Sequence, residues 1–219
     1  MVTRRKLGRG LLILLALATA ITLFAVGFNA RNGVVSLMIL AGLWFVDRGT
    51  RSDLSLFVKR TGDAERGAQA EEDVGAVLNH LPANCRVLHD VVAGHGNIDH
   101  VVLRDDGVAF LIETKSHSGI VTPARAEQFL KQTHGNIYWL RDFLKETSGM
   151  EVWINAAVVF TNAEVRFKNP IRGVSFMPIG NLSQWITGAP GNPQIAKQLG
   201  PKLDSIIAAL LNPKLRRPQ

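Results

Sequence analysis

The sequence predicts an α/β fold, a mixed sheet flanked by helices, preceded by an N-terminal transmembrane helical hairpin. From about residue 64 onward, segments with apolar residues at helical spacing alternate with short apolar runs rich in β-branched residues. That alternation is typical of a sheet covered by helices. Before residue 50 the apolar residues instead form two long runs, which is the pattern of segments that cross a bilayer.

The two apolar runs cover residues 11–28 and 34–46. The first is long enough to span a bilayer, while the second is intermediate between a short span and a re-entrant segment. A cleaved signal peptide with a basic start is the alternative. We favour the hairpin because residues 28–30 make a poor cleavage site and a second apolar run follows at once. Residues 1–50 are therefore expected to anchor the chain in a lipid bilayer.

Basic residues flank this anchor on both sides, whereas Arg31 alone lies between the two runs. The flanking residues are Arg4, Arg5, Lys6, Arg9, Arg48, Arg51, Lys59 and Arg60. The positive-inside rule then places both termini in the cytoplasm. We expect a multi-pass protein of the cell membrane whose remaining residues lie on the cytoplasmic side.

The basic excess of the chain lies mostly beside the anchor. Residues 1–50 hold six of the 25 Lys and Arg residues but one of the 18 Asp and Glu residues. The rest of the chain is near neutral, so the pI near 10.0 is weak evidence for nucleic-acid binding. The single cysteine, Cys85, excludes an intramolecular disulfide.

Residues 51–63 are expected to form a polar linker, residues 64–211 one domain and residues 212–219 a basic tail. The domain is long enough to bury a sizeable core. Its periodicities predict a helix over residues 64–80, strands over 85–92, 97–104 and 107–117, a helix over 123–147, strands over 152–161 and 173–179, and helices over 182–186 and 193–211.

Two acids and a lysine fall on two neighbouring predicted strands. Asp99 begins one apolar run, and Glu113 and Lys115 lie near the end of the next. Because side chains alternate along a strand, Glu113 and Lys115 share one face. A Glu-x-Lys pair is often only a weak ion pair on a solvated edge, but here apolar residues surround it. A carboxylate in that setting needs an ion pair, hydrogen bonds or a metal ion.

The turn between these strands decides whether the two acids meet. A three-residue loop over residues 105–107, with its glycine in the left-handed region, places Asp99 opposite Glu113. A two-residue loop over residues 106–107 instead places Asp99 opposite Thr114 and turns Glu113 to the other face. A shared site therefore requires the longer loop, or a bulge with the same effect.

The helix over residues 64–80 offers a further acid. Glu71 flanks its apolar stripe, so we expect the side chain to point toward the sheet. An ordinary surface acid is the alternative.

Three motifs occur in order in this part of the chain: Arg66-Gly67-x-x-Ala70-Glu71, Asn97-Ile98-Asp99-His100 and Ile112-Glu113-Thr114-Lys115. Together they resemble the nuclease-related domain, NERD, over roughly residues 65–162. That family is similar to the PD-(D/E)xK restriction-endonuclease-like superfamily, so the resemblance implies a restriction-endonuclease-like sheet. It also implies an active site formed by Glu71, Asp99, Glu113, Lys115 and Gln132.

The assignment of the glutamine stays open. Many members of the family carry Asn-Pro shortly before it, whereas this chain has no Asn-Pro there. Either Gln128 or Gln132 therefore fits the family position.

The acids also indicate a cofactor. The carboxylates of Asp99 and Glu113 suit Mg²⁺ or Mn²⁺, and the backbone carbonyl of Thr114 is a further candidate ligand. Without an ion, clustered carboxylates repel one another and one should take up a proton. Lys115 is expected to orient a water molecule and to offset negative charge at a phosphate.

The sequence thus predicts a membrane-anchored, metal-dependent nuclease that hydrolyses phosphodiester bonds, with DNA expected as its substrate before RNA. Two alternatives stay open: a module that binds nucleic acid without cutting it, and a protein-interaction module at the membrane. The complete set of acids and lysine favours the enzyme. The near-neutral charge after residue 50 counts against tight non-specific DNA binding.

We predict that the full chain partitions with membranes, while a fragment of residues 51–219 is soluble and folded, because all long apolar runs precede Asp47. Fractionation of cells expressing each form measures this. Full-length protein in the soluble fraction, or a chain trimmed near Ala30 and exported, would contradict the anchor.

Overall fold

The computed structural model describes residues 61–94 and 96–212, together with a few isolated earlier residues. The expected anchor in residues 1–50 thus lies outside the described residues except at those isolated positions, as do most of the linker and of the basic tail. Within the described part, no helix is both long and apolar enough to cross a membrane. From Ala64 onward the chain forms one compact unit.

The core of this unit is a five-stranded mixed sheet with the strands in sequence order. The first strand pairs antiparallel with the second, and the second with the third. The third strand pairs parallel with the fourth, and the fourth with the fifth. The strands are β1 (Cys85–Ala93), β2 (Gly96–Arg104), β3 (Ala109–Val121), β4 (Ile154–Val165) and β5 (Val174–Pro178). This confirms the predicted α/β fold and mixed sheet.

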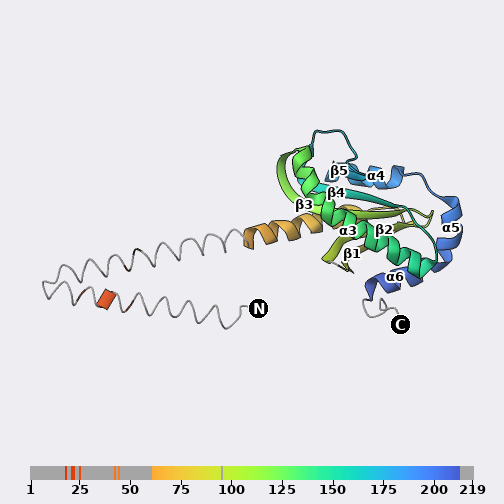
Figure 1. Cartoon of the computed structure of the whole chain (residues 1–219), viewed down its shortest axis with the longest axis horizontal. Helices are drawn as coiled ribbons and strands as arrows, with labels where there is room; N and C mark the ends of the chain where they lie inside the picture. The colour runs from red at the N-terminus through yellow and green to blue at the C-terminus, as the bar shows by residue number, and fades with distance from the viewer. Residues whose placement is uncertain are drawn as a thin grey trace. The chain divides into compact units, whose positions relative to one another are not determined.

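Helices cover both faces of the sheet. They comprise residues 61–79, α3 (Pro123–Ser148), α4 (Leu182–Gly188), α5 (Pro193–Leu199) and α6 (Leu203–Leu211), with 3-10 turns η1 (Ile179–Asn181) and η2 (Gly200–Lys202). Figure 1 shows the long α3 lying across the sheet, with α6 next to β1.

Successive residues of β3 face two different hydrophobic clusters, which is the two-residue period of a strand buried on both faces. Leu111 joins the cluster under α3 and α6. Phe110 and Ile112 join the cluster under the 61–79 helix and α4. The side chains of Glu113 and Lys115, in phase with Leu111, therefore belong to the α3 face.

The long α3 has clear start and stop signals. The hydroxyl of Thr122 accepts a hydrogen bond from the Arg125 amide, and Pro123 occupies the first turn. Both features favour a helix start. Gly149 ends the helix with φ of 76°, a conformation that glycine adopts without strain.

Three predicted boundaries are wrong, one of them the end of β4, which lies at Val165 instead of residue 161. The helix expected over residues 193–211 is interrupted by η2, because Pro201 has no amide hydrogen to donate and clashes with the preceding turn. In addition, β3 continues to Val121 through a register shift between Lys115 and Ser118, which a search for simple alternation does not find.

The β2–β3 connection is the three-residue loop that a shared site requires. The Arg104 amide donates to the Val108 carbonyl at 2.9 Å, and the Gly107 amide donates to the Arg104 carbonyl at 3.2 Å. Gly107 has φ of 85°, in the left-handed region. The pairs from His100 with Ile112 to Leu103 with Ala109 continue this register.

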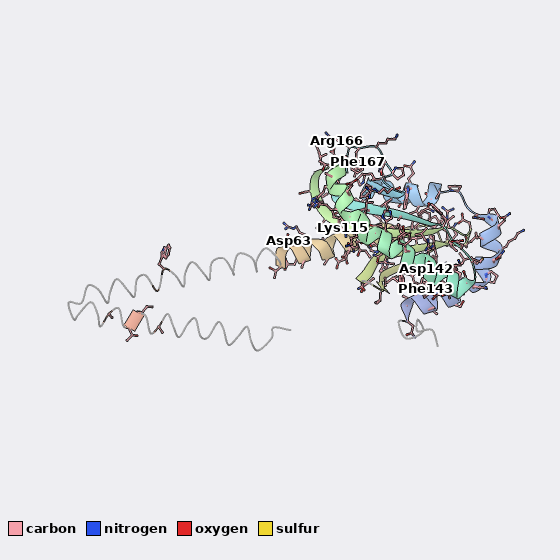
Figure 2. All side chains as sticks on the ribbon, in the orientation of Figure 1. Asp63, Lys115, Asp142, Phe143, Arg166 and Phe167 are labelled. Carbon is pink, nitrogen blue, oxygen red and sulfur yellow. The ribbon has the colours of Figure 1, made fainter. Side chains whose placement is uncertain are left out.

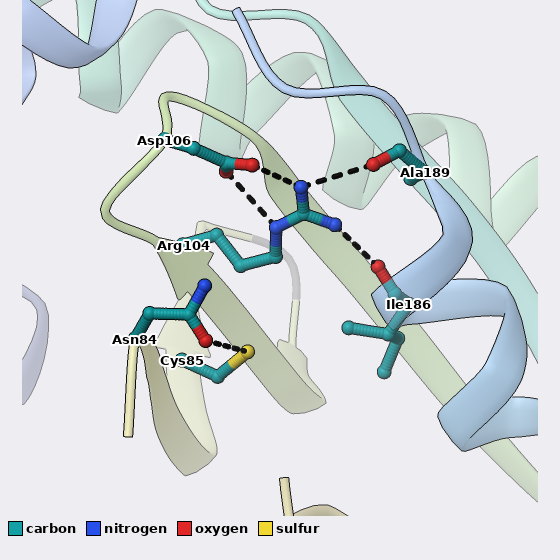
Figure 3. A network of polar contacts seen from close by, with 6 residues as sticks. All are labelled: Asn84, Cys85, Arg104, Asp106, Ile186 and Ala189. Atoms are coloured by element: carbon teal, nitrogen blue, oxygen red, sulfur yellow. Dashed lines mark hydrogen bonds and ion pairs between the residues drawn. The ribbon is translucent and has the colours of Figure 1, made fainter. Parts of the chain in front are cut away.

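A buried arginine ties this loop to the far end of the sequence (Figure 3). The Arg104 guanidinium forms an ion pair with Asp106 and donates to the carbonyls of Ile186 at 2.6 Å and Ala189 at 3.0 Å. The Asn192 amide donates to the Asp106 carbonyl at 2.8 Å. The end of α4 and the start of α5 therefore hold the loop in one conformation.

We predict that Gly107→Ala destabilises the domain far more than Gly119→Ala. Both glycines have positive φ, 85° and 82°, so each alanine costs about 1–2 kcal/mol of backbone strain. A Cβ on Gly107 would also lie 2.7 Å from the Ala196 amide nitrogen, whereas one on Gly119 would meet no described atom within 4 Å. The expected loss in free energy of unfolding is about 2–5 kcal/mol for Gly107→Ala. Equal losses in denaturant titrations would contradict the close approach.

Candidate active site

The register of β2 and β3 brings Asp99 and Glu113 together. The last pair of the ladder is His100 with Ile112, so the next residues outward are Asp99 and Glu113. Beyond that pair the Asp99 carboxylate accepts a hydrogen bond from the Thr114 amide at 2.6 Å. Asp99 therefore lies beside β3, next to Glu113, and a metal site shared by the two acids stays a prediction.

Glu113 is an acid inside the core. Its residue is 0% exposed, and two side chains of α3 hold its carboxylate. Gln132 donates to Oε2 at 3.2 Å, and Asn136 donates to Oε1 at 2.7 Å. The Lys115 ammonium lies 3.5 Å from Oε2. These three contacts come from side chains of β3 and α3.

The environment favours the neutral form of Glu113. Burial, and then the charge of Asp99, raise its pKa to about 7, although Lys115 and the hydrogen bond from Asn136 act in the opposite direction. Burial also raises the pKa of Asp99, against the hydrogen bond from Thr114. When no cation lies between them, the two carboxylates repel one another, and this repulsion favours a proton on Glu113.

Lys115, labelled in Figure 2, belongs to a cationic group around one aromatic ring. Its Nζ and the Arg125 guanidinium each lie 5.9 Å from the centre of the Phe129 ring. Arg125 donates to the ring of His117 at 3.1 Å and to the side-chain oxygen of Gln128 at 2.9 Å. Gln128 thus belongs to the Arg125 group, and of the two candidate glutamines Gln132 is the one that touches Glu113.

Glu71 lies at an open cavity of about 500 Å³ between the 61–79 helix and the middle of β1 and β2. Asp90, Asp99 and His100 also line it. Partial burial, followed by the charges of Asp99 and Asp90, raises the pKa of Glu71. Glu71 is an exposed residue at this cavity, so a role for it in the site stays a prediction.

Two features of the site were not predicted. The first is Asn136, which lies one helical turn after Gln132. Two amide side chains four residues apart, on a helix face otherwise lined by buried residues, are the sequence signal that would have identified Asn136. His89 and His100 form a pair with their Nδ1 atoms 2.8 Å apart. Burial, and then His89, lower the pKa of His100 to about 4, so the His100 ring is neutral at pH 7.

The donor set fits a hard divalent cation that keeps part of its water shell. Among the residues that the structure describes, no three His, Cys, Asp or Glu side chains gather as a complete metal-binding group. Mg²⁺ is commonly held by one or two carboxylates together with waters and substrate phosphates, and Asp99 and Glu113 supply two. Thr114 meets Asp99 through its amide, and a ligand role for its carbonyl stays a prediction.

The comparisons with known proteins give a family match for part of the chain. Residues 66–161 match the family model described as "Nuclease-related domain", NERD. This part of the chain is similar to nuclease-related domains. The match begins in the first predicted motif and ends in β4, so Glu71, Asp99, Glu113, Lys115 and Gln132 all lie within it.

Beyond the NERD match, resemblances are remote. A crystal structure of a repair endonuclease from Pyrococcus abyssi is 14% identical with a TM-score of 0.26, over 43% of this chain and 38% of that chain. No curated protein matches the chain. The α4, α5 and α6 helices lie after the NERD match.

We predict that Glu113→Gln stabilises the metal-free protein at alkaline pH and has little effect near pH 4. A folded-state pKa of about 7, above the ordinary value of 4.5, means that the unfolded chain loses its proton first. Stability then falls as the pH rises between these values. The amide removes this fall, which is worth up to about 3 kcal/mol.

Thermal unfolding in the presence of a chelator, at about pH 4 and pH 8, measures this effect. Glu164→Gln, at an exposed acid paired with Arg166, is the control and should leave the unfolding temperature unchanged at both pH values. A gain from Glu113→Gln that is the same at both pH values would show that titration of Glu113 is not its cause.

Proposed function

We propose that this chain is a membrane-anchored, metal-dependent endonuclease that hydrolyses phosphodiester bonds, with DNA as its substrate. The observation that carries this proposal is the fully buried Glu113 carboxylate beside Asp99 and 3.5 Å from Lys115. A buried acid with a raised pKa costs the fold stability, and such costs are concentrated at functional sites. The NERD match supports a nuclease-like activity for the same residues.

Asp99 and Glu113 are the residues that would hold Mg²⁺ or Mn²⁺, with the carbonyl of Thr114 as a further ligand. When bound, the ion supplies Lewis acidity toward a phosphoryl oxygen. Gln132 and Asn136 fix the plane of the Glu113 carboxylate, since each donates to one of its oxygens. Oε1 keeps a further lone pair for a second partner, whereas Oε2 already has both Gln132 and Lys115 beside it.

Lys115 supplies positive charge for the reaction. Its side chain is partly exposed while its ammonium stays close to Glu113, so it can donate to a phosphate oxygen at the surface of the site. Charge placed in advance where negative charge develops lowers the barrier. Glu71, at the neighbouring cavity with Asp99, is placed to accept a hydrogen bond from the attacking water and to orient it.

The membrane location rests on the sequence. The apolar runs over residues 11–28 and 34–46, with basic residues on their outer flanks, support an anchor with the nuclease-related domain on its cytoplasmic side.

One observation favours a second candidate, a module that binds nucleic acid without cutting it. Both oxygens of Glu113 already accept hydrogen bonds from α3, an arrangement that also serves a carboxylate with no metal. Cleavage with Mg²⁺ or Mn²⁺ separates the two functions.

We predict that Lys115→Ala lowers the rate of DNA cleavage by the full chain about a hundredfold or more, since it removes one charge from the transition state. Binding of Mn²⁺ should be largely retained. Glu113→Ala should lose both activity and Mn²⁺ binding. Lys197→Ala, at an exposed position of α5, is the control and should cleave at the wild-type rate.

Cleavage of single- and double-stranded DNA and RNA with each ion, alongside calorimetric titration with Mn²⁺, makes these measurements. If the wild-type chain cuts none of them with either ion, the binding module replaces the enzyme. If Lys115→Ala cuts at the wild-type rate, the role assigned to Lys115 is wrong.

A further inference from the structure

A second cavity, of about 410 Å³, lies between α3, the start of β4 and the turn before β5. Two aromatic side chains at this cavity face solvent: Trp153 is 81% exposed and Tyr138 is 55% exposed. Trp153 is the most exposed large hydrophobic side chain among the residues that the structure describes. Its exposure leaves an aromatic face that a ligand could cover, with a gain in hydrophobic free energy.

Two arginines and a histidine share this cavity with the two aromatic rings. The Arg141 guanidinium lies 5.2 Å from the centre of the Tyr138 ring. The His134 ring is stacked against the same Tyr138 ring, with 6.4 Å between the ring centres. Arg172 also lines the cavity. Aromatic faces interleaved with arginine are the composition that binds unpaired nucleotides, because every base has a face to stack and a phosphate beside it.

The position of Arg172 is strained. The amide and carbonyl of Ile171 are both hydrogen-bonded to Val174 at 3.0 Å, which closes a two-residue turn over Arg172 and Gly173. Arg172 has φ of 48°, a conformation that favours glycine or asparagine at this place in a turn. A hydrogen bond of 3.0 Å from His134 to the Arg172 carbonyl holds it. Strained residues of this kind are concentrated at ligand sites.

The carboxylates around the cavity select a base over a bare anion. Arg141 is paired with Asp142 at 2.9 Å and Arg172 with Glu127 at 3.6 Å. Both pairs are exposed and contribute little, so a phosphate can take over the guanidinium donors. Glu151 lines the cavity itself. Its carboxylate repels free phosphate but can accept hydrogen bonds from the amino group of a base.

The same helix serves this cavity and the candidate active site. Gln132 and Asn136 of α3 contact Glu113, while His134 and Tyr138, on another face of the helix, line the cavity. We propose that the cavity binds an unpaired nucleobase of the nucleic-acid substrate, stacked on Trp153, with the adjoining phosphate at Arg172 and Arg141. This inference rests on the proposed function, since it names the class of substrate as a strand with unpaired bases.

Two features of the cavity favour an unpaired base over a base in a duplex. In a duplex the faces of the bases are covered by their neighbours, so a side chain such as Trp153 can stack only on a base that has left the helix. The cavity volume is also within the range of sites that enclose one small ligand, whereas a duplex requires an extended groove.

The test measures binding to the full chain without metal, so that no cleavage occurs. A labelled single-stranded oligodeoxynucleotide and its duplex are titrated, and tryptophan fluorescence is recorded in parallel. Trp153→Ala should weaken binding of the single strand about tenfold or more and remove most of the fluorescence quenching, with duplex binding unchanged. Arg172→Gly, which suits the positive φ, should weaken single-strand binding and lower its salt dependence by about one phosphate contact.

Arg166→Ala is the matched control, an exposed arginine paired with Glu164 away from the cavity lining, and it should bind like the wild type. Single-strand binding that neither cavity variant weakens overturns this inference and leaves the proposed nuclease intact. Wild-type binding to the duplex alone also overturns it. Cavity-dependent binding of single strands by a chain that never cuts supports the inference while the proposed function fails.

Discussion

The register of the β2–β3 hairpin is the constraint on which the candidate site depends. A slip of one residue would turn Glu113 to the opposite face of the sheet, away from Gln132 and Asn136. The Asp105–Gly107 loop sets the register, and buried Arg104 holds that loop by donating to carbonyls at the end of α4. Helices outside the NERD match thus support the geometry within it.

The buried acid opposes the stability that this scaffold provides. A carboxylate with no exposure and a pKa of about 7 is worse for folding than an apolar residue of similar size. The amides of Gln132 and Asn136 reduce this cost and also fix the orientation of the carboxylate. The site is therefore pre-shaped by α3, and binding of a cation would relieve the repulsion between Glu113 and Asp99.

Most of the fold could be predicted from local signals in the sequence. Alternation along β2 and β3 and the Asp-Gly turn are short-range, so the hairpin and the paired acids could be predicted. The choice between the two loop lengths could not, because it depends on Arg104 contacting Ile186, 82 positions away. The His89–His100 pair likewise depends on the β1–β2 register, which places these two residues opposite one another. The break before α6 was missed although Pro201 marks it, because the apolar period continues across it.

The two faces of α3 have a mechanical consequence. A helix of 26 residues moves as a nearly rigid rod, so a ligand that shifted or tilted it from the Tyr138 side would also move Gln132 and Asn136 relative to Glu113. The amide hydrogen bonds that favour ionised Glu113 would lengthen or shorten with that displacement. A ligand on the Tyr138 face of α3 would then change the affinity of Glu113 for a cation. By thermodynamic reciprocity, the cation would change the affinity for that ligand by the same factor.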